Sequence, residues 1–331
     1  MRNAPGRGRP GQERRSGRFP RVLVLVLCLA FGLGLYGEWL GQQASSAYPP
    51  RGQFHQLAKG RLHYRDIRPE GASLGTVVLV HGAWSGHADL FSALAPALRD
   101  HRVIAVDRPG EGWSERLGDS QMASPAKQAE AIMQLLDAVA PERFVVVAHS
   151  LGAPLSAHIA LERPARVKGL VLLGAVTHPW LSSLKHGTAP VTSAWLGPIF
   201  NRVVSIPLTK LLMAAGASFA FAPNAVPPDY ADAAELPLLL RAETFRDNAQ
   251  DIIAADAFLV EQAPRYSDLK VPVVAIAGDH DAVISPATHS AAMVRAAPLG
   301  SLILLPGVGH MPHHAAADII TRAIRTLAAR T

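Results

Sequence analysis

Short apolar runs recur along the chain, and segments of helical length separate most of them. The runs lie at residues 76–82, 101–107, 144–150, 168–174, 271–278 and 301–307, and the helix-length segments at 88–99, 125–139, 151–162, 286–297 and 314–329. Continuous apolar strands that alternate with helices are typical of a parallel sheet covered on both faces. With two further strands near 53–58 and 61–67 as an antiparallel start, the pattern predicts an α/β fold with a mostly parallel, doubly wound sheet.

The alternation is interrupted once, between Leu173 and Val271. About a hundred residues pass there without a clear strand, which is too long for a bare loop. We therefore predict a helical cap at 176–268, inserted after the sixth strand, and an α/β core at 53–175 and 269–331. The cap holds no Asp or Glu before Asp229 and is rich in Leu, Phe, Trp and Met. This composition suits an apolar substrate or a lipid surface, although packing among the cap helices is its commoner cause.

The longest apolar run lies near the N-terminus. Residues 22–36, VLVLVLCLAFGLGLY, carry no charge, and the run continues past Glu38 to Leu40. Its length lies between the core of a signal peptide and a full membrane span, so a cleaved signal and an uncleaved anchor both fit. Small residues at 44–47 would offer a cleavage site, which would make the protein secreted or periplasmic.

We favour the anchor, because the arginine-rich segment before it is long for a signal peptide. The expected order is a basic cytoplasmic tail at 1–21, a membrane anchor or signal segment at 22–40, and a linker at 41–52. The rest of the chain, the body, would then lie on the non-cytoplasmic side. The only cysteine, Cys28, lies within the apolar run, so the body has no cysteine for a disulfide, a zinc cluster or a nucleophile.

The net charge of +6 would suggest a nucleic-acid partner if it were spread over the body. Residues 1–21 instead hold seven of the 32 basic residues and one of the 26 acidic residues, so the remaining chain carries 25 of each. The body is formally neutral, and we expect no nucleic acid among its partners.

A serine lies at a junction between a predicted strand and a predicted helix. In FVVVAHSLGAPLSAHIA, residues 144–160, the apolar run ends at Ser150 and a helix-like stretch follows. A tight turn there would project the hydroxyl into the crevice at the carboxyl ends of the strands, with helix N-terminal N–H groups behind it. Ala148 and Gly152 provide the small side chains that such a crowded turn needs. Taken alone, the motif fits a helix-capping serine equally well.

Two later strand ends bring the partners that a nucleophilic serine requires. GDHDAVISP contains Asp279 and Asp281, and PGVGHMPHH contains His310. A histidine can take the serine proton, and a carboxylate can hold the histidine in the required tautomer. His313 and His314 follow closely, but no nearby cysteine or paired carboxylate completes a ligand set, so we expect no metal.

Together these motifs resemble the α/β-hydrolase superfamily over about residues 55–329. AHSLG is similar to its nucleophile elbow, with Ala148 in place of the first glycine, and the order serine, acid, histidine is that of its triad. The resemblance implies that Ser150, Asp281 and His310 are catalytic and that Asp279 is a turn carboxylate.

The same resemblance extends to the loops that follow two earlier strands. LVHGAW, residues 79–84, is similar to the family's H-G-x turn, which implies an oxyanion hole made by the N–H groups of Ala83 and Leu151. It also implies that Trp84 lines the substrate pocket and that His81 and Asp107 are structural.

The implied activity is that of a serine hydrolase without a cofactor, in the esterase and lipase-like branch that bears a cap. Its substrate would be a carboxylic ester of an apolar small molecule or lipid. A serine at 150 argues against haloalkane dehalogenase or epoxide hydrolase action, which in this superfamily use an aspartate nucleophile.

Three alternatives remain open from the sequence. A carbon–carbon bond hydrolase would use the same triad and would need a basic cap residue for the carboxylate of its substrate, for which Arg202, Lys210 and Arg241 are candidates. A peptidase that removes N-terminal residues is disfavoured by the lack of acids at 163–228. A membrane-anchored binding protein could have kept the fold and lost catalysis.

Overall fold

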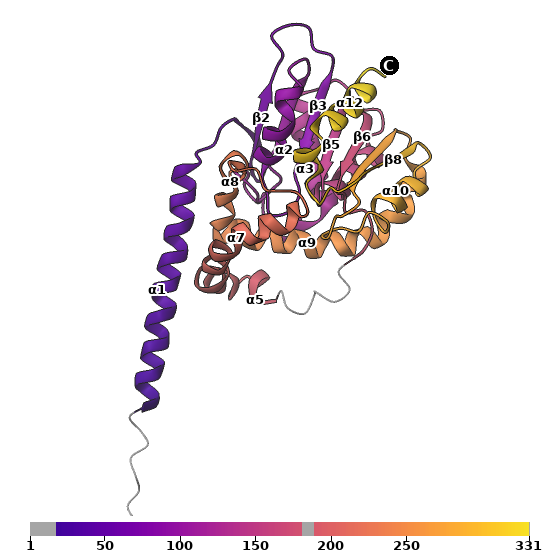
Figure 1. Cartoon of the computed structure of the whole chain (residues 1–331). Helices are drawn as coiled ribbons and strands as arrows, with labels where there is room; N and C mark the ends of the chain where they lie inside the picture. Colours follow the sequence, from indigo (N-terminus) through magenta and orange to yellow (C-terminus); the bar gives the residue numbers. More distant parts are fainter. Residues whose placement is uncertain (1–17, 181–188, 331) are drawn as a thin grey trace, which may run out of the picture.

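The computed structural model describes residues 18–180 and 189–330. An eight-stranded sheet forms its centre, in the order β1-β2-β4-β3-β5-β6-β7-β8 (Figure 1). β1 and β2 form an antiparallel hairpin, β2 pairs antiparallel with β4, and the remaining pairs are parallel. The strands are Gln53–Leu57, Gly60–Ile67, Thr76–Val80, Arg102–Val106, Phe144–His149, Val167–Leu173, Val273–Gly278 and Gly300–Leu305, for β1 to β8. The predicted α/β fold with a mostly parallel sheet is confirmed.

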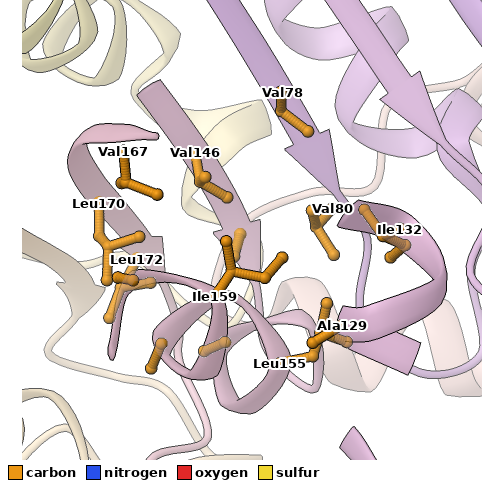
Figure 2. Close-up of a cluster of buried hydrophobic side chains, with 14 of the residues drawn as sticks. Val78, Val80, Ala129, Ile132, Val146, Leu155, Ile159, Val167, Leu170 and Leu172 are labelled. Atoms are coloured by element: carbon orange, nitrogen blue, oxygen red, sulfur yellow. The ribbon is translucent and has the colours of Figure 1, made fainter. Parts of the chain in front are cut away.

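Both faces of the sheet are apolar, which explains why its strands appear as continuous runs in the sequence. Side chains alternate between the faces of a strand. In β3, Val78 and Val80 contribute to one core cluster, while Val77 and Leu79 contribute to the other. Figure 2 shows the first cluster, in which strand residues pack against helices α3 and α4.

Helices cover both faces. On the face shown in Figure 2 lie α3 (Pro125–Val139), α4 (Gly152–Glu162) and α10 (Ser290–Ala296). On the other face lie α2 (His87–Leu94) and α12 (Ala317–Ala328). Short turns η1 (Ala95–Ala97), η2 (Ser120–Ala123) and α11 (Pro312–Ala315) complete the core. Parallel pairing aligns Val80 with Ala148 and Ala148 with Leu172, so the loops after β3, β5 and β6 leave from the same edge.

The chain leaves the sheet after β6 and forms a helical cap before β7, as predicted. α9 is the longest cap helix among the described residues and runs beneath the strand ends (Figure 1). The cap elements are α5 (Ala189–Thr192), α6 (Gly197–Phe200), η4 (Asn201–Ser205), α7 (Ile206–Phe221), α8 (Tyr230–Ala233), η5 (Leu236–Leu240), α9 (Ala242–Gln262) and η6 (Ala263–Asp268).

The N-terminal helix α1 (Arg18–Ala47) is longer than the sequence pattern indicates. It continues through Ala47, seven residues into the segment expected to be a linker. Leu40 and Ala44 are buried, and Leu40 packs in one cluster with Ile206 and Leu240 of the cap. Tertiary packing therefore stabilises these polar last turns as a helix. The helix ends before Tyr48, because Pro49 disfavours helical backbone at the residue that precedes it.

Two helical segments of the described chain are long and apolar enough to cross a membrane. They are Arg21–Ala47 and Gly197–Phe221, and both are mostly exposed. The first lies beside the cap, and its N-terminal half extends away from the body (Figure 1). A long, exposed apolar helix near the N-terminus is consistent with a signal anchor or a signal sequence.

Candidate active site

Ser150 occupies a left-handed turn between β5 and α4. Its φ is +48°, a conformation that non-glycine residues rarely adopt. The turn is crowded, because a Cβ on Gly152 would lie 2.5 Å from the carbonyl oxygen of Val80 and one on Gly82 would lie 3.0 Å from Cβ of Ser150. Ala148, which replaces the family's first glycine, is fully buried in the core without disturbing the strand.

The structure brings Ser150, His310 and Asp281 together from three loops at this edge of the sheet. Nε2 of His310 lies 3.1 Å from Oγ of Ser150, and Nδ1 of His310 lies 2.8 Å from Oδ2 of Asp281. The other carboxylate oxygen of Asp281 accepts the N–H groups of Val283 and Ile284, at 2.9 and 2.8 Å. All three side chains are buried, so bulk water competes little with these hydrogen bonds.

Asp279 lies outside this chain of contacts. Its Oδ1 accepts the N–H of Gly307 at 2.7 Å and a ring N–H of His280 at 2.6 Å. It therefore holds the turn after β7 against the loop that carries His310, as expected of a turn carboxylate.

The turn after β3 lies directly against Ser150. Gly82 approaches the Ser150 Cβ, and the residues expected as oxyanion donors, Ala83 and Leu151, lie next to these two positions in the chain. Trp84 follows with a φ of +53°, and its ring packs on Phe245 of α9 at 4.8 Å between centroids.

The cap supplies a residue to this turn that sequence reasoning missed. Oδ1 of Asn248, in α9, accepts the N–H of Trp84 at 2.7 Å, and its Nδ2 donates to Glu111. Asn248 is fully buried, and no local motif marks it, since its partners lie 137 and 164 residues away in the chain.

A buried charge network holds α9 in place around Asn248. Asp251, one turn further along α9, accepts from Arg108 and Arg116, each at 2.7 Å. Burial raises the pKa of Glu111 well above its usual range, although the Arg108 charge opposes this effect. These contacts tie the cap to the loop after β4.

Behind His310 lies a second group of histidines, in which His149 joins His313 and His314, the pair already noted in the sequence. Nε2 of His149 donates to the carbonyl oxygen of His310 at 3.0 Å, and the ring of His149 packs on His313. Burial lowers the pKa of His149 well below its usual range, so its ring is neutral at pH 7. His313 and His314 donate to Asp89 at 3.2 and 2.8 Å and belong to α11.

His81 and Asp107 have structural contacts, as expected. His81 is buried, donates from Nδ1 to Gly82 O at 2.8 Å and accepts the Arg108 N–H at 3.0 Å. Burial and the Arg108 charge lower the pKa of His81 to about 3, which keeps it neutral. Asp107 accepts from the His63 ring at 2.7 Å and from the His87 backbone at 2.8 Å.

Among the described residues, two buried groups have ligand atoms close enough to hold a metal ion, within 4.8 Å of one another: Asp89, His149 and His313, and separately His63, His87 and Asp107. In each group the carboxylate already accepts hydrogen bonds from ring nitrogens of histidines. These bonds account for the clustering without an ion.

Of the three basic cap residues considered for binding a substrate carboxylate, two arginines are engaged by other groups and the lysine is exposed on the cap. Arg202 donates to Glu38 and Glu243, at 2.7 and 2.6 Å. Arg241 donates to the carbonyl oxygen of Gly112 and lies over the Trp113 ring, while Lys210 is exposed on α7.

A family model described as the alpha/beta hydrolase fold matches residues 75–317, which include the three residues of the Ser150 site. The chain belongs to this family. The predicted resemblance to the α/β-hydrolase superfamily is therefore confirmed.

Individual relatives carry several hydrolase names. A 2-hydroxy-6-oxononadienedioate/2-hydroxy-6-oxononatrienedioate hydrolase of Dechloromonas aromatica is 24% identical over 268 residues, covering 80% of this chain and 89% of that protein. Two further curated relatives match this chain over only 44% and 41% of their own length.

Solved structures of the same fold are similar over most of the chain. An enol-lactonase from Burkholderia xenovorans LB400 has a TM-score of 0.68 at 19% identity, covering 84% of this chain and 100% of that one. A bacterial membrane phospholipase A has a TM-score of 0.64 at 20% identity, covering 94% and 97%. At sequence identities this low, the structural similarity shows only that the fold is shared.

Proposed function

We propose that this protein is a serine hydrolase that cleaves a carboxylic ester through an acyl-enzyme intermediate. The observation that carries the proposal is the continuous hydrogen-bond path from Ser150 Oγ through His310 to Asp281. Membership of a hydrolase family supports it.

The contacts of His310 define the first step. Asp281 accepts a hydrogen bond from Nδ1–H, which leaves the lone pair of Nε2 directed at the Ser150 hydroxyl. As Ser150 Oγ attacks the ester carbonyl carbon, its proton moves to Nε2, and Asp281 stabilises the resulting imidazolium. The N–H groups of Ala83 and Leu151 are proposed to bind the oxyanion of the tetrahedral intermediate.

His310 then gives its proton to the alkoxide, and the alcohol leaves. A water molecule attacks the acyl-enzyme while His310 takes its proton, and the collapse of the second tetrahedral intermediate returns the proton to Ser150 and releases the acid. Trp84, packed on Phe245, is proposed to line the apolar side of the substrate pocket.

We also propose that α1 is an uncleaved anchor, with the body on the non-cytoplasmic side. Cleavage near residues 44–47 would remove Leu40, which packs against Ile206 and Leu240, and would expose that part of the cap to water. The arginines before the apolar run support the orientation.

Carbon–carbon bond hydrolysis is a second candidate, favoured by the Dechloromonas relative. It would need a cation for the carboxylate of its substrate. The engagement of Arg202 by two glutamates and of Arg241 by a backbone carbonyl makes both less suited to that role.

The test is a series of p-nitrophenyl esters from acetate to palmitate, assayed with the full chain in detergent beside Ser150→Ala. The proposal predicts hydrolysis that depends on Ser150 and has an optimum of acyl length. Turnover of a 2-hydroxy-6-oxo-dienedioate, with none of any ester, would favour carbon–carbon cleavage instead. A Ser150→Ala variant with wild-type rates would exclude the proposed nucleophile.

A further inference from the structure

The cap carries a large exposed apolar surface, which we call the cap face. It is made by eight side chains that are between 41% and 89% exposed: Trp195, Leu196, Ile199, Val204, Leu208, Leu211, Leu212 and Phe219. Most of it lies on the continuous helical segment Gly197–Phe221 formed by α6, η4 and α7. Within α7, only Ile206 and Phe221 are buried. The exposed sides of α7 are apolar except at Lys210, and an exposed surface of this kind is typical of a membrane contact, where a lysine can extend its amine to the interface.

The cap face lies next to the N-terminal helix. A Cβ on Gly34 of α1 would lie 3.5 Å from the Val203 side chain, and the backbone of Arg202 packs directly on Gly37. One turn later, Leu40 packs in a cluster with Ile206 at the start of α7. The segment that carries the cap face therefore contacts α1 between Gly34 and Leu40, near the end of the apolar run of α1.

The length of α1 places these contacts at membrane depth. Residues 22–37 form the uncharged run of α1 before Glu38, and at about 1.5 Å per residue they span only about 24 Å. The hydrocarbon of a bilayer is about 30 Å thick, so a helix that crosses it must use roughly 20 residues. The span therefore has to reach as far as Leu40, which brings Val203 and Ile206 to the edge of the same leaflet.

The charges at this level are compensated. Glu38, the only charged residue between Arg21 and Arg51, accepts from Arg202 at 2.7 Å and from Gln42 at 3.2 Å. A paired charge at the membrane interface is tolerated far better than an isolated one. Trp195 is 89% exposed, and tryptophan is the residue type enriched where a protein surface meets the interface.

We propose that α1 crosses the membrane and that the cap face is embedded in the hydrocarbon of the leaflet nearer the body. The occupant of this surface is the hydrocarbon of the bilayer, since the face adjoins the exposed apolar surface of α1 and the charge at η4, Arg202, is paired with Glu38 of α1. This inference rests on the anchor proposed above.

The cap face also leads to the Ser150 site. Phe219 is 58% exposed, and its neighbour Ala220 accepts the backbone N–H of His310 at 3.0 Å. One end of the surface is thus at the anchor and the other is beside the proposed base. If the protein has the proposed activity, its substrate class is an ester lipid taken from this leaflet.

The direct test measures the environment of the cap face in the full chain, reconstituted in phosphatidylcholine vesicles. In a Cys28→Ser background, Leu211→Cys and, separately, Leu74→Cys are labelled with an environment-sensitive fluorophore. Leu211 is 76% exposed on the cap face, and Leu74 is a matched control, 59% exposed on the core. We expect blue-shifted emission at 211 that acyl-chain nitroxide lipids quench severalfold, with little change at 74.

Two results would overturn the proposal. Equal, water-like emission at both positions would place the cap face in solvent. If the nitroxide lipids do not quench the fluorophore at position 211, but its emission changes with the ratio of protein to lipid, a second copy of the chain covers the cap face. Neither readout depends on catalysis, so this test is separate from that of the proposed activity.

Activity of a charged variant tests the substrate class. For Leu208→Glu/Leu211→Glu, we expect a loss of about tenfold or more against a long-chain ester embedded in vesicles, and an unchanged rate against a soluble short ester. Leu74→Glu is the control and should affect neither. Equal rates for the double variant and the wild type on the embedded ester would exclude uptake from the leaflet, while absence of turnover on both esters in the wild type would count against the hydrolase function instead.

Discussion

The backbone N–H of His310 donates to the carbonyl oxygen of Ala220, 3.0 Å away in the last turn of α7. The last four carbonyls of a helix lack partners within the helix, so α7 has an acceptor free for the loop after β8. The same loop is held by Asn224, which accepts the N–H of Gly309 at 3.1 Å and donates to the carbonyl oxygen of Gly307 at 3.0 Å. The cap thus helps to position the histidine of the core.

Removing the Asn224 side chain should therefore reduce catalysis without touching the substrate. For Asn224→Ala we expect kcat to fall about threefold to tenfold and the free energy of unfolding to fall by about 1 kcal/mol, since two hydrogen bonds are lost. Asn224→Asp keeps an acceptor for Gly309 and should recover part of kcat. Ester hydrolysis and urea unfolding of both variants measure these effects, and an unchanged kcat in Asn224→Ala would show that the α7 contact alone holds the loop.

The two aspartates after β7 should respond very differently to the same substitution. Asp281→Asn removes the carboxylate that holds the His310 tautomer, and kcat should fall by about 10³ to 10⁴. Asp279→Asn lies outside the triad and should change kcat by less than about tenfold, with a small loss of stability from the bond to Gly307. Steady-state ester kinetics of the pair decide the assignment, and the opposite ranking would transfer the catalytic role to Asp279.

Asn248 should act as a positioning residue for the turn that carries Ala83. Asn248→Leu leaves the Trp84 N–H without its acceptor and removes the amide that donates to Glu111, and we expect kcat to fall about 10- to 100-fold with a smaller change in KM. Val260→Ala, on an exposed part of the same helix, is the matched control and should keep both constants. A loss of stability with kcat intact would mean that Asn248 only joins the cap to the core.

Buried neutral histidines should make the fold sensitive to acid. His81 has a pKa lowered to about 3 in the folded protein, against about 6.5 when unfolded, so between these values the unfolded chain binds the additional proton. The stability that His81 contributes is complete above pH 6.5 and is lost as the pH falls towards 3.

The measurement is the free energy of unfolding of the full chain in detergent as a function of pH. His81→Gln cannot take up this proton, so between pH 6 and 4 its slope should be smaller than that of the wild type by about 1.4 kcal/mol per pH unit. Identical slopes would mean that the buried His81 ring titrates normally.

The fold and the three residues around Ser150 were predictable because their signals are local. Ser150 directly follows an apolar strand, Asp281 and His310 lie in the loops just after two others, and parallel pairing brings such strand ends together. The helical insertion was predictable from the length of the gap between two strands.

The contacts of the cap were not predictable from the same patterns. Asn248 reaches Trp84 across 164 residues, and Asn224 reaches Gly309 across 85, from segments whose sequence carries no motif. The end of α1 was missed for a related reason. Its polar last turns are typical of a linker, whereas in the structure Leu40 packs on the cap and Ala44 is buried, which favours the continued helix.

The measurement that tests the central claim most directly is the site of covalent modification by an alkyl fluorophosphonate. The account predicts one adduct per chain by intact mass, mapped to the peptide that contains Ser150. Ser150→Ala should form no adduct, and the rate of labelling should be at least about 10³-fold lower in His310→Ala. An adduct at another serine, or equal labelling of Ser150→Ala, would contradict the assignment of Ser150 as the nucleophile.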